Sequence, residues 1–497
     1  MSRTQFAGKP SSVSRALARD RLGVPAVLFF VLAGVAPLTV AAGVIPTAYA
    51  TTGLTGIPAA FLVVAVILGL FATGYVAMTR HITNAGAFYA FIARGLGRVP
   101  GVAAALVALL AYTFLQVGLY GALGPSAAAE AALHLRLHAA WWVWALVAWA
   151  VITLLGLLRV DITGRVLGVL LTAEVVVIVA ETVSGLGRPA GGHLSFATLS
   201  PAGLAAAGFG TFGVLAVVAV LGFVGFEQAP VLAEEARHPR RTVPVATYCA
   251  LGVIALVYAA AAWAMAAHAG RAHVVAAAAA RGPGLLFGLG GSTLSQTAQV
   301  LFLTSLFAAA LAFHNCVWRY IYALGREGVL PAALGRTGGN NIPKAASLVQ
   351  SVTGLITIGA YALGGWQPMT HLFFWLGTTG GFGVLVLLAT TAVAVIAFFA
   401  RDPRGETAWR RLIAPSLAAL LLAGIVVLAV LHYRTLLGVP PGAVAAWALP
   451  ASYAVVALAG AGWGLVLRRR RPRVYATIGL GPHVITGQFA PATATAP

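Results

Sequence analysis

The chain contains 497 residues, of which 60% are hydrophobic and 8% are charged, and its formal net charge is +20. A soluble domain carries about a quarter charged residues, so this composition excludes a soluble fold. The Lys and Arg residues lie between apolar runs and form no patch with interleaved aromatic residues, which argues against a nucleic-acid partner. The two cysteines, Cys249 and Cys316, lie inside apolar runs without disulfide or metal-site spacing, so we expect neither a metal nor a cofactor.

Twelve long apolar runs follow one another along the chain. In lipid every backbone polar group must be bonded within the protein, which leaves helices or closed barrels as spanning structures. The runs are continuous and close to the ~20 residues that a helix needs to cross about 30 Å of hydrocarbon. We therefore predict an all-α integral membrane protein whose first helix is retained and not cleaved as a signal peptide. The expected helices cover residues 24–50, 55–78, 99–127, 140–158, 164–186, 201–232, 243–267, 292–324, 344–362, 368–399, 411–432 and 442–467.

The positions of Lys and Arg predict the orientation of these helices. With the N-terminus placed inside, 26 of the 31 Lys and Arg residues fall in inside segments and 5 fall outside. Cytoplasmic loops of membrane proteins carry such an excess. We expect a multi-pass protein of the cell membrane with both termini in the cytoplasm. The loops leave no room for an ATPase domain, so uphill transport would need an ion gradient.

The first and sixth expected helices differ from plain membrane helices. Pro37 and Pro46 remove backbone donors from the first, and glycines such as Gly222 and Gly225 interrupt the sixth just before Glu227. Non-helical backbone at membrane depth is tolerated where it is buried in protein or lines a cavity. Interrupted helices five apart indicate two inverted repeats with a transport site between them. The alternative is that the glycines only allow close helix packing.

Three motifs occur in the order and spacing of a known superfamily. Gly-Phe-Glu at 225–227 precedes Glu-Glu-Ala-Arg-His-Pro-Arg-Arg-Thr-Val-Pro at 234–244. Thr-Asn-Ala-Gly-Ala-Phe-Tyr lies at 83–89, and Arg-Tyr-Ile-Tyr-Ala-Leu-Gly-Arg-Glu-Gly-Val-Leu-Pro lies at 319–331. The chain resembles permeases of the amino acid–polyamine–organocation superfamily, in the amino acid permease branch. His238 stands where the family usually has Asn, and the last four helices match only as apolar spans.

The resemblance implies a leucine-transporter-like fold with two inverted five-helix repeats, broken helices 1 and 6, and two further C-terminal helices. It also implies alternating access, with amino acids or polyamines as substrates. The expected parts are a cytoplasmic tail (1–21), the first repeat (22–187), the second repeat (200–400), the two additional helices (408–467) and a basic, disordered cytoplasmic tail (468–497).

The resemblance also indicates a substrate site at the two breaks. In the family, amides of a Gly-Ser-Gly turn in helix 1 hold the substrate carboxylate, and an aromatic residue near the break of helix 6 contacts the substrate. The turn aligns with residues 39–41, which lack the glycines, and for the aromatic at 223 plain packing is an equal alternative. The expected substrate-binding residues are Pro37, Thr39, Val40, Ala41, Leu221, Phe223, Val224 and Gly225.

Two carboxylates stand out within the expected helices, where a charge is costly and usually marks function. Glu227 matches the acidic residue of the family motif, which implies a proton-coupling or structural role. Glu174 in helix 5 stands where many family members carry a lysine that takes the place of a sodium ion. It could carry the coupling proton, help Thr304 and Ser305 to hold a cation, or hydrogen-bond as a neutral acid.

Four further acidic residues have simpler interpretations. Glu130 and Glu181 lie near the outer ends of their helices and suit a solvated rim. Glu234 and Glu235, with the arginines that follow them, suit a charge network at the inner membrane surface, and a role in an inner gate is the alternative.

Together these features predict a secondary amino acid transporter, with proton-coupled symport into the cell as the leading interpretation. A polyamine importer of the putrescine type is the first alternative, because polyamines lack a carboxylate and suit acidic partners. A transport-inactive membrane sensor or partner subunit is an alternative of a different class. We expect no enzyme activity, because no catalytic motif of a membrane enzyme is present. The expected partners are a small-molecule substrate, a proton and the lipid bilayer.

Overall fold

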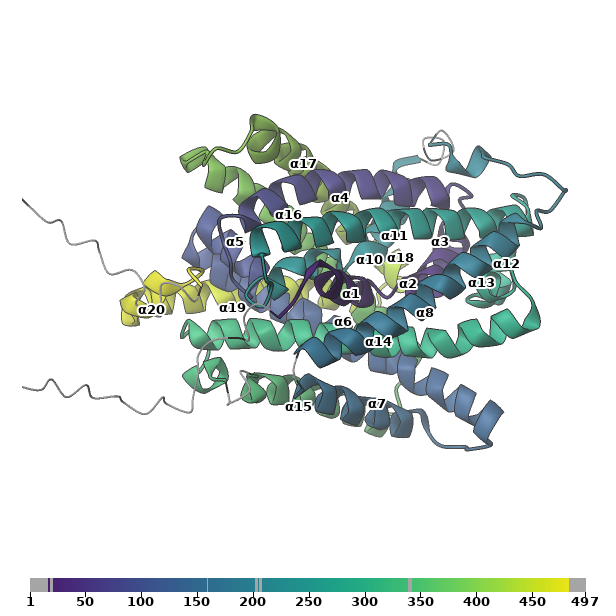
Figure 1. Ribbon diagram of the computed structural model, residues 1–497, viewed down its shortest axis with the longest axis horizontal. Coiled ribbons are helices and arrows are strands. Elements are labelled where there is room, and N and C mark those ends of the chain that lie inside the picture. The colour runs from purple at the N-terminus through teal and green to yellow at the C-terminus, as the bar shows by residue number, and fades with distance from the viewer. Residues whose placement is uncertain are drawn as a thin grey trace, which may run out of the picture.

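The protein is built from helices. Across the part of the chain that the computed structural model describes there is no strand, and the one β-bridge, between Leu22 and Ala236, is isolated. The long helices run roughly along the horizontal axis of Figure 1. The predicted all-α membrane fold is confirmed. The described residues are 17, 21–158, 160–201, 204, 208–337 and 342–481.

Eleven helical segments of these ranges are long and apolar enough to cross a membrane. Two of them are broken, and two others begin with a π-helical stretch. Their elements are α1 (Val24–Val35), α2 (Pro37–Thr39), η1 (Val40–Val44) and α3 (Ile45–Thr52), then α4 (Ile57–Thr79), α6 (Arg98–Leu135), α8 (Val160–Leu186), α10 (Gly208–Phe223) with η3 (Phe226–Leu232), α11 (Pro239–Ala269), α14 (Ser292–Arg326), α15 (Lys344–Leu363), η5 (Pro368–Trp375) with α16 (Leu376–Arg401), η6 (Trp409–Ile413) with α17 (Ala414–Leu431), and α19 (Ala445–Arg470).

The fourth predicted span is an apolar helix of 16 residues, α7 (Trp141–Gly156). It rises about 24 Å, less than the ~30 Å of a hydrocarbon core, so the residues beside it must complete a crossing. The remaining short elements are α5 (Ala87–Gly95), η2 (Ala197–Leu199), α12 (Val274–Arg281), α13 (Gly284–Phe287), η4 (Ala332–Gly335), α18 (Tyr433–Leu437) and α20 (Pro472–Thr477).

The peripheral helices keep large apolar side chains on the outer surface. Val169 of α8, Leu420 of α17 and Leu458 of α19 are all more than two thirds exposed. Such side chains would cost free energy in water and cost nothing against lipid tails. Small residues let α19 pack closely, since Gly460 lies directly against Ala103 of α6. The two C-terminal helices α17 and α19 therefore cover the bundle from outside.

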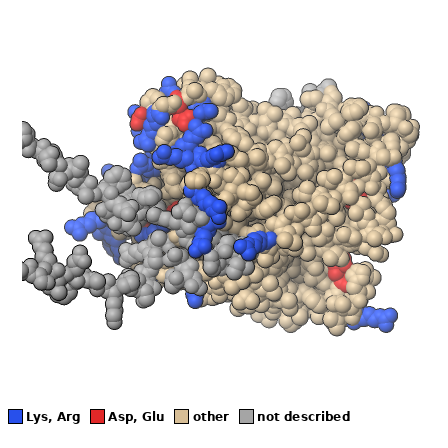
Figure 2. All heavy atoms as spheres, viewed as in Figure 1, with Lys and Arg blue, Asp and Glu red and all other residues tan. Residues whose placement is uncertain are grey.

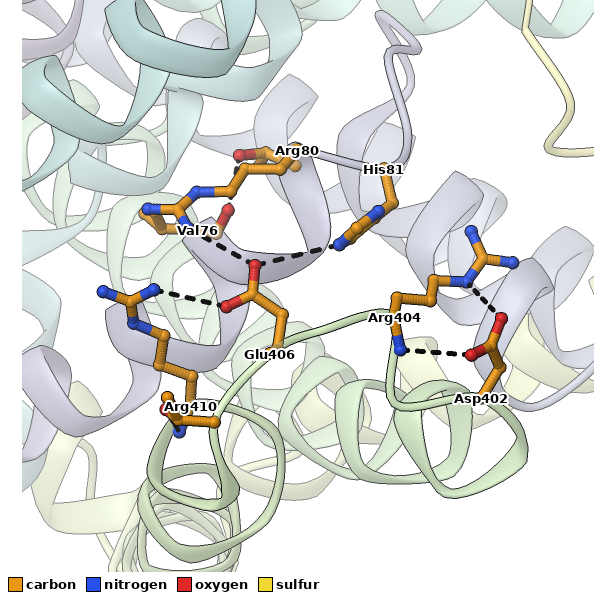
Figure 3. A network of polar contacts seen from close by, with 9 residues as sticks. Val76, Arg80, His81, Asp402, Arg404, Glu406 and Arg410 are labelled. Carbon is orange, nitrogen blue, oxygen red and sulfur yellow. Dashed lines mark hydrogen bonds and ion pairs between the residues drawn. The ribbon is translucent and has the colours of Figure 1, made fainter.

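Charged side chains gather at one end of the molecule. Figure 2 shows most of the visible Lys and Arg at the left, and a broad flank almost free of charge. Figure 3 shows how the loop after α16 is tied to the end of α4 at the basic end: a Glu406 oxygen lies 3.3 Å from an Arg80 nitrogen and 3.8 Å from His81 Nε2. Some predicted parts lie outside the described residues, namely 1–16 and 18–20 of the N-terminal tail, 202–203 and 205–207 of the sixth helix, and 482–497 of the C-terminal tail.

Candidate functional site

The first break lies at Ala36, earlier than the sequence predicted. Helix α1 ends at Val35, Ala36 adopts the left-handed conformation with φ of 53°, and Pro37 begins α2. A proline disfavours helical backbone in the residue before it and is well suited to a first helical position. Residues 39–41, expected to form the turn, are therefore helical, in α2 and in the π-helical stretch η1.

The second break lies at Val224 and Gly225, next to Phe223 as predicted. Gly225 has φ of 121°, which side-chain-bearing residues rarely adopt. A Cβ atom on Gly225 would lie 2.7 Å from the Val35 backbone nitrogen, and one on Gly222 would lie 3.2 Å from Val40 Cγ1. The two breaks therefore touch, with backbone against backbone.

Glu227 holds the second break in place. Its carboxylate accepts a hydrogen bond from the Gly225 backbone N–H at 2.8 Å and another from the Tyr112 hydroxyl of α6 at 2.8 Å. The Tyr75 hydroxyl of α4 donates to the Glu227 carbonyl oxygen at 2.9 Å. The side chain is fully buried. Both carboxylate oxygens are thus used to fix non-helical backbone, which suits a structural role.

Glu174 lies where broken helix 1 meets helices α8 and α14. Its carboxyl accepts hydrogen bonds from the Ser305 hydroxyl and the Leu38 backbone N–H. Thr39 donates to the same Ser305 oxygen, from its hydroxyl at 3.1 Å and its backbone N–H at 3.3 Å. Glu174 Oε2 is buried and has no hydrogen-bond partner among the described residues. Thr304 points elsewhere, because its hydroxyl donates to the Leu301 carbonyl of its own helix.

An aromatic cluster adjoins the breaks. Phe223 packs against Phe61 of α4 and Tyr258 of α11, with ring centroids 6.0 and 5.9 Å away, and these two rings are 5.3 Å apart. The buried Tyr258 hydroxyl has no hydrogen-bond partner among the described residues and interacts electrostatically with Glu174. The sequence did not mark Phe61 or Tyr258, because an aromatic residue in an apolar run carries no signal of the face it occupies.

The other predicted residues are buried around the same point or turned away from it. Val40, Ala41 and Val224 are buried at the breaks. Leu221 packs against Gly381 of α16, on a different side of α10. The structure thus brings together part of helix 1, the end of α10, and Glu174 with Ser305.

Two ion pairs join the segment after η3 to α14. The Glu235 carboxylate accepts a hydrogen bond from Arg319 Nε at 2.7 Å, and both side chains are almost fully buried. The Glu234 carboxylate accepts two from Arg326, at 2.6 and 2.7 Å. The sequence suggested a surface network here, and that expectation was wrong, since these pairs lie inside the protein between the segment after η3 and α14.

The fold and this geometry define a multi-spanning membrane permease, and comparison with known proteins agrees. The family model described as "Amino acid permease" matches residues 26–474, so the chain belongs to the amino acid permease family. Its members are transporters and not enzymes. The chain is also 26% identical over 206 residues to the branched-chain amino acid permease BcaP of Lactococcus lactis subsp. cremoris (strain MG1363). That match covers 40% of this chain and 42% of the relative.

Proposed function

We propose that this protein is a secondary amino acid transporter that works by alternating access and couples uptake to a proton on Glu174. The observation that carries the proposal is the junction of Glu174, Ser305 and the start of α2. A buried carboxyl with one bonded and one free oxygen can accept a proton without losing its partners. Family membership supports amino acids as the substrate class.

The proposed coupling depends on how strongly the hydrogen bonds of Glu174 hold helix 1 against α8 and α14. When Glu174 is ionised, its hydrogen bonds to Ser305 and to the Leu38 N–H are charge-assisted, and such bonds are roughly twice as strong as neutral ones. A proton on Glu174 weakens the tie between helix 1 and the pair α8 and α14. A ligand shifts a conformational equilibrium only through such a difference between two states.

The proposed substrate site lies at the touching breaks of helices 1 and 6. Groups there are backbone atoms freed by the breaks, together with the cluster of Phe223, Phe61 and Tyr258. From the sequence we retain Pro37, Thr39, Val40, Ala41, Val224 and Gly225 as lining residues, with Leu221 on the margin. The ion pairs Glu235–Arg319 and Glu234–Arg326 would form the inner gate, because they join helix 6 to α14 on the basic side.

The proposed orientation places the basic end in the cytoplasm of the cell. Positively charged residues concentrate on the cytoplasmic side of membrane proteins. The described ends of the chain, before α1 and after α20, lie at this end in Figure 1. The two inverted repeats at 22–187 and 200–400 are part of the same proposal.

The test is uptake of labelled amino acids and putrescine by purified protein in liposomes, with and without an inward proton gradient. We expect amino acid uptake that the gradient stimulates, and Glu174→Gln should lose the stimulation while it still exchanges substrate without a gradient. Glu130→Gln, a partly exposed carboxylate beside His134, is the matched control and should behave as wild type. Stimulation that persists in Glu174→Gln would refute coupling at this residue. Uptake of putrescine alone would assign a polyamine importer, and binding without flux would assign a sensor.

A further inference from the structure

We propose that Glu181 is the outer proton-relay residue of this transporter, passing protons from the charge-poor side of the membrane to Glu174. The inference deepens the proposed function and rests on proton coupling at Glu174. The sequence suggested a solvated rim position for Glu181, and the geometry differs from that expectation.

Glu174 and Glu181 form a pair on one face of α8. They are seven residues apart, which is close to two helical turns, so both point the same way about 10 Å apart along the axis. Their exposed fractions are 1% and 0%. Each has a buried oxygen without a hydrogen-bond partner among the described residues, Oε2 of Glu174 and Oε1 of Glu181. A carboxylate that only capped a helix or faced solvent would not combine this burial with a buried oxygen that has no partner.

The surroundings of Glu181 place it close to the outer end of the bundle. Its Oε2 accepts a hydrogen bond from the Gly290 backbone N–H at 2.6 Å, in the turn between α13 and α14. It lies five residues before the end of α8 at Leu186. One turn further along the helix, Gly185 packs against Leu289 of the same turn. A thin cover of loop and helix end thus separates Glu181 from the outer solution.

Few other ionisable groups face the side of α8 that carries Glu174 and Glu181. From α11 they are Tyr258, beside Glu174, and His268, whose Nδ1 lies 3.1 Å from the Arg188 carbonyl oxygen. On α8 itself the nearest described one is the exposed Arg165, nine residues before Glu174, and past the end of the helix the exposed Arg188 follows Glu181 by seven residues. The other packed elements contribute none, since α1, α2, α13 and residues 292–313 of α14 carry no ionisable side chain. Among the described residues, therefore, no fixed opposite charge holds either carboxylate permanently ionised.

The proposed step is a proton transfer between two carboxyl groups through water. Glu181 takes a proton from the outer solution, gives it to water between α8 and α14, and that water protonates the Glu174 carboxylate. Glu181 keeps the electron pair of its broken O–H bond and so returns to its ionised form. Because about 10 Å is too far for a direct transfer and each hydrogen bond spans about 2.8 Å, the path needs two or three waters.

The experiment compares Glu181→Gln, Glu174→Gln and Glu130→Gln in liposomes with a fixed internal pH and a varied external pH. Glutamine keeps a carbonyl oxygen for the Gly290 N–H, so the variant retains the bond that orders the turn. A group that transfers a proton at a reacting atom raises the rate by a factor of about 10²–10⁴. Glu181 acts one step away from Glu174, so we expect gradient-driven uptake in Glu181→Gln to fall only about tenfold. Exchange without a gradient should be unchanged, the dependence on external pH should flatten, and Glu181→Asp should restore part of it.

Each other outcome separates the two proposals. A wild-type external-pH profile in Glu181→Gln, with stimulation lost in Glu174→Gln, overturns the relay and leaves the proposed function standing. Loss of exchange together with driven uptake in Glu181→Gln assigns a structural role and overturns the relay. Full stimulation in Glu174→Gln overturns the coupling proposal itself, and the relay with it.

Discussion

The breaks of helices 1 and 6 each have a buried glutamate, and the two glutamates are bonded differently. Glu227 accepts from Tyr112 and from Gly225, so both of its oxygens are occupied. Glu174 accepts from Ser305 and Leu38 and keeps a free buried oxygen. Burial alone therefore does not identify a coupling residue. What differs is whether both carboxylate oxygens are already hydrogen-bonded, as in Glu227, or one buried oxygen remains without a partner among the described residues, as in Glu174.

The largest effect that would sharpen this comparison is expected at Gly225. In Gly225→Ala the residue would keep φ near 121°, and its methyl group would meet the Val35 backbone, which cannot move aside as a flexible side chain does. Strained backbone of this kind costs of order 1–3 kcal/mol, and the contact adds to it, so we expect a loss of about 3 kcal/mol or more. Thermal unfolding of purified protein measures it. Gly252→Ala in α11, where a Cβ meets nothing, is the control and should be neutral or stabilising.

The next effect contrasts the two glutamates directly. In Glu227→Gln one of the two buried donors, Tyr112 or Gly225, loses its acceptor, and an unsatisfied buried group costs about 1–3 kcal/mol. In Glu174→Gln the retained oxygen can still accept, so stability should change little. Thermal unfolding of both variants side by side measures the difference. Equal destabilisation would contradict the distinction between a structural and an exchangeable carboxylate.

A smaller effect is expected from Tyr75→Phe. The hydroxyl of Tyr75 donates to the Glu227 carbonyl oxygen. The ring of Tyr75 is stacked on that of Phe71, with centroids 5.0 Å apart, and a phenylalanine at this position can keep the stacking. Removal of one ordinary hydrogen bond costs about 1 kcal/mol. We expect a modest fall in unfolding temperature with transport retained, and a fall as large as that of Gly225→Ala would show that the break depends on this one bond.

The smallest effect lies away from both breaks, at His81 (Figure 3). The pKa of His81 is lowered from its ordinary value of 6.5, because partial burial and then the charge of Arg404 disfavour the imidazolium. The neutral form therefore stabilises the fold above pH 6.5, and this contribution is lost as the pH falls through the lowered pKa. We expect a small loss of thermal stability on acidification that His81→Gln removes. A loss that persists in His81→Gln would have to come from another group.

Much of the fold could be predicted from the sequence, because length and hydropathy are the main requirements for a membrane helix. The interrupted helices were also visible, since proline and glycine change the backbone locally. The positions of the contacts were not. In lipid both the inner and outer faces of a helix are apolar, so no periodicity marked Phe61 or Tyr258 as inward-facing. Nor did the sequence show that Glu235 and Arg319 would be buried. Burial of a charged residue is expected only when its ion-pair partner is known, and these two residues lie far apart in the sequence.

The segment that leads into α1 adds a mechanical consequence. Arg21 and Leu22 donate backbone hydrogen bonds to the Glu235 carbonyl oxygen at 3.0 Å, and Arg237 donates to Leu22 at 2.9 Å. At the other end of α1, Gly225 touches Val35. The half-helix α1 thus contacts the chain around η3 at both of its ends. Under the alternating access proposed above, we expect α1 and this chain to move together as one rigid unit. A crosslink between them would then leave the proposed opening intact, whereas a crosslink from α1 to α14 would prevent it.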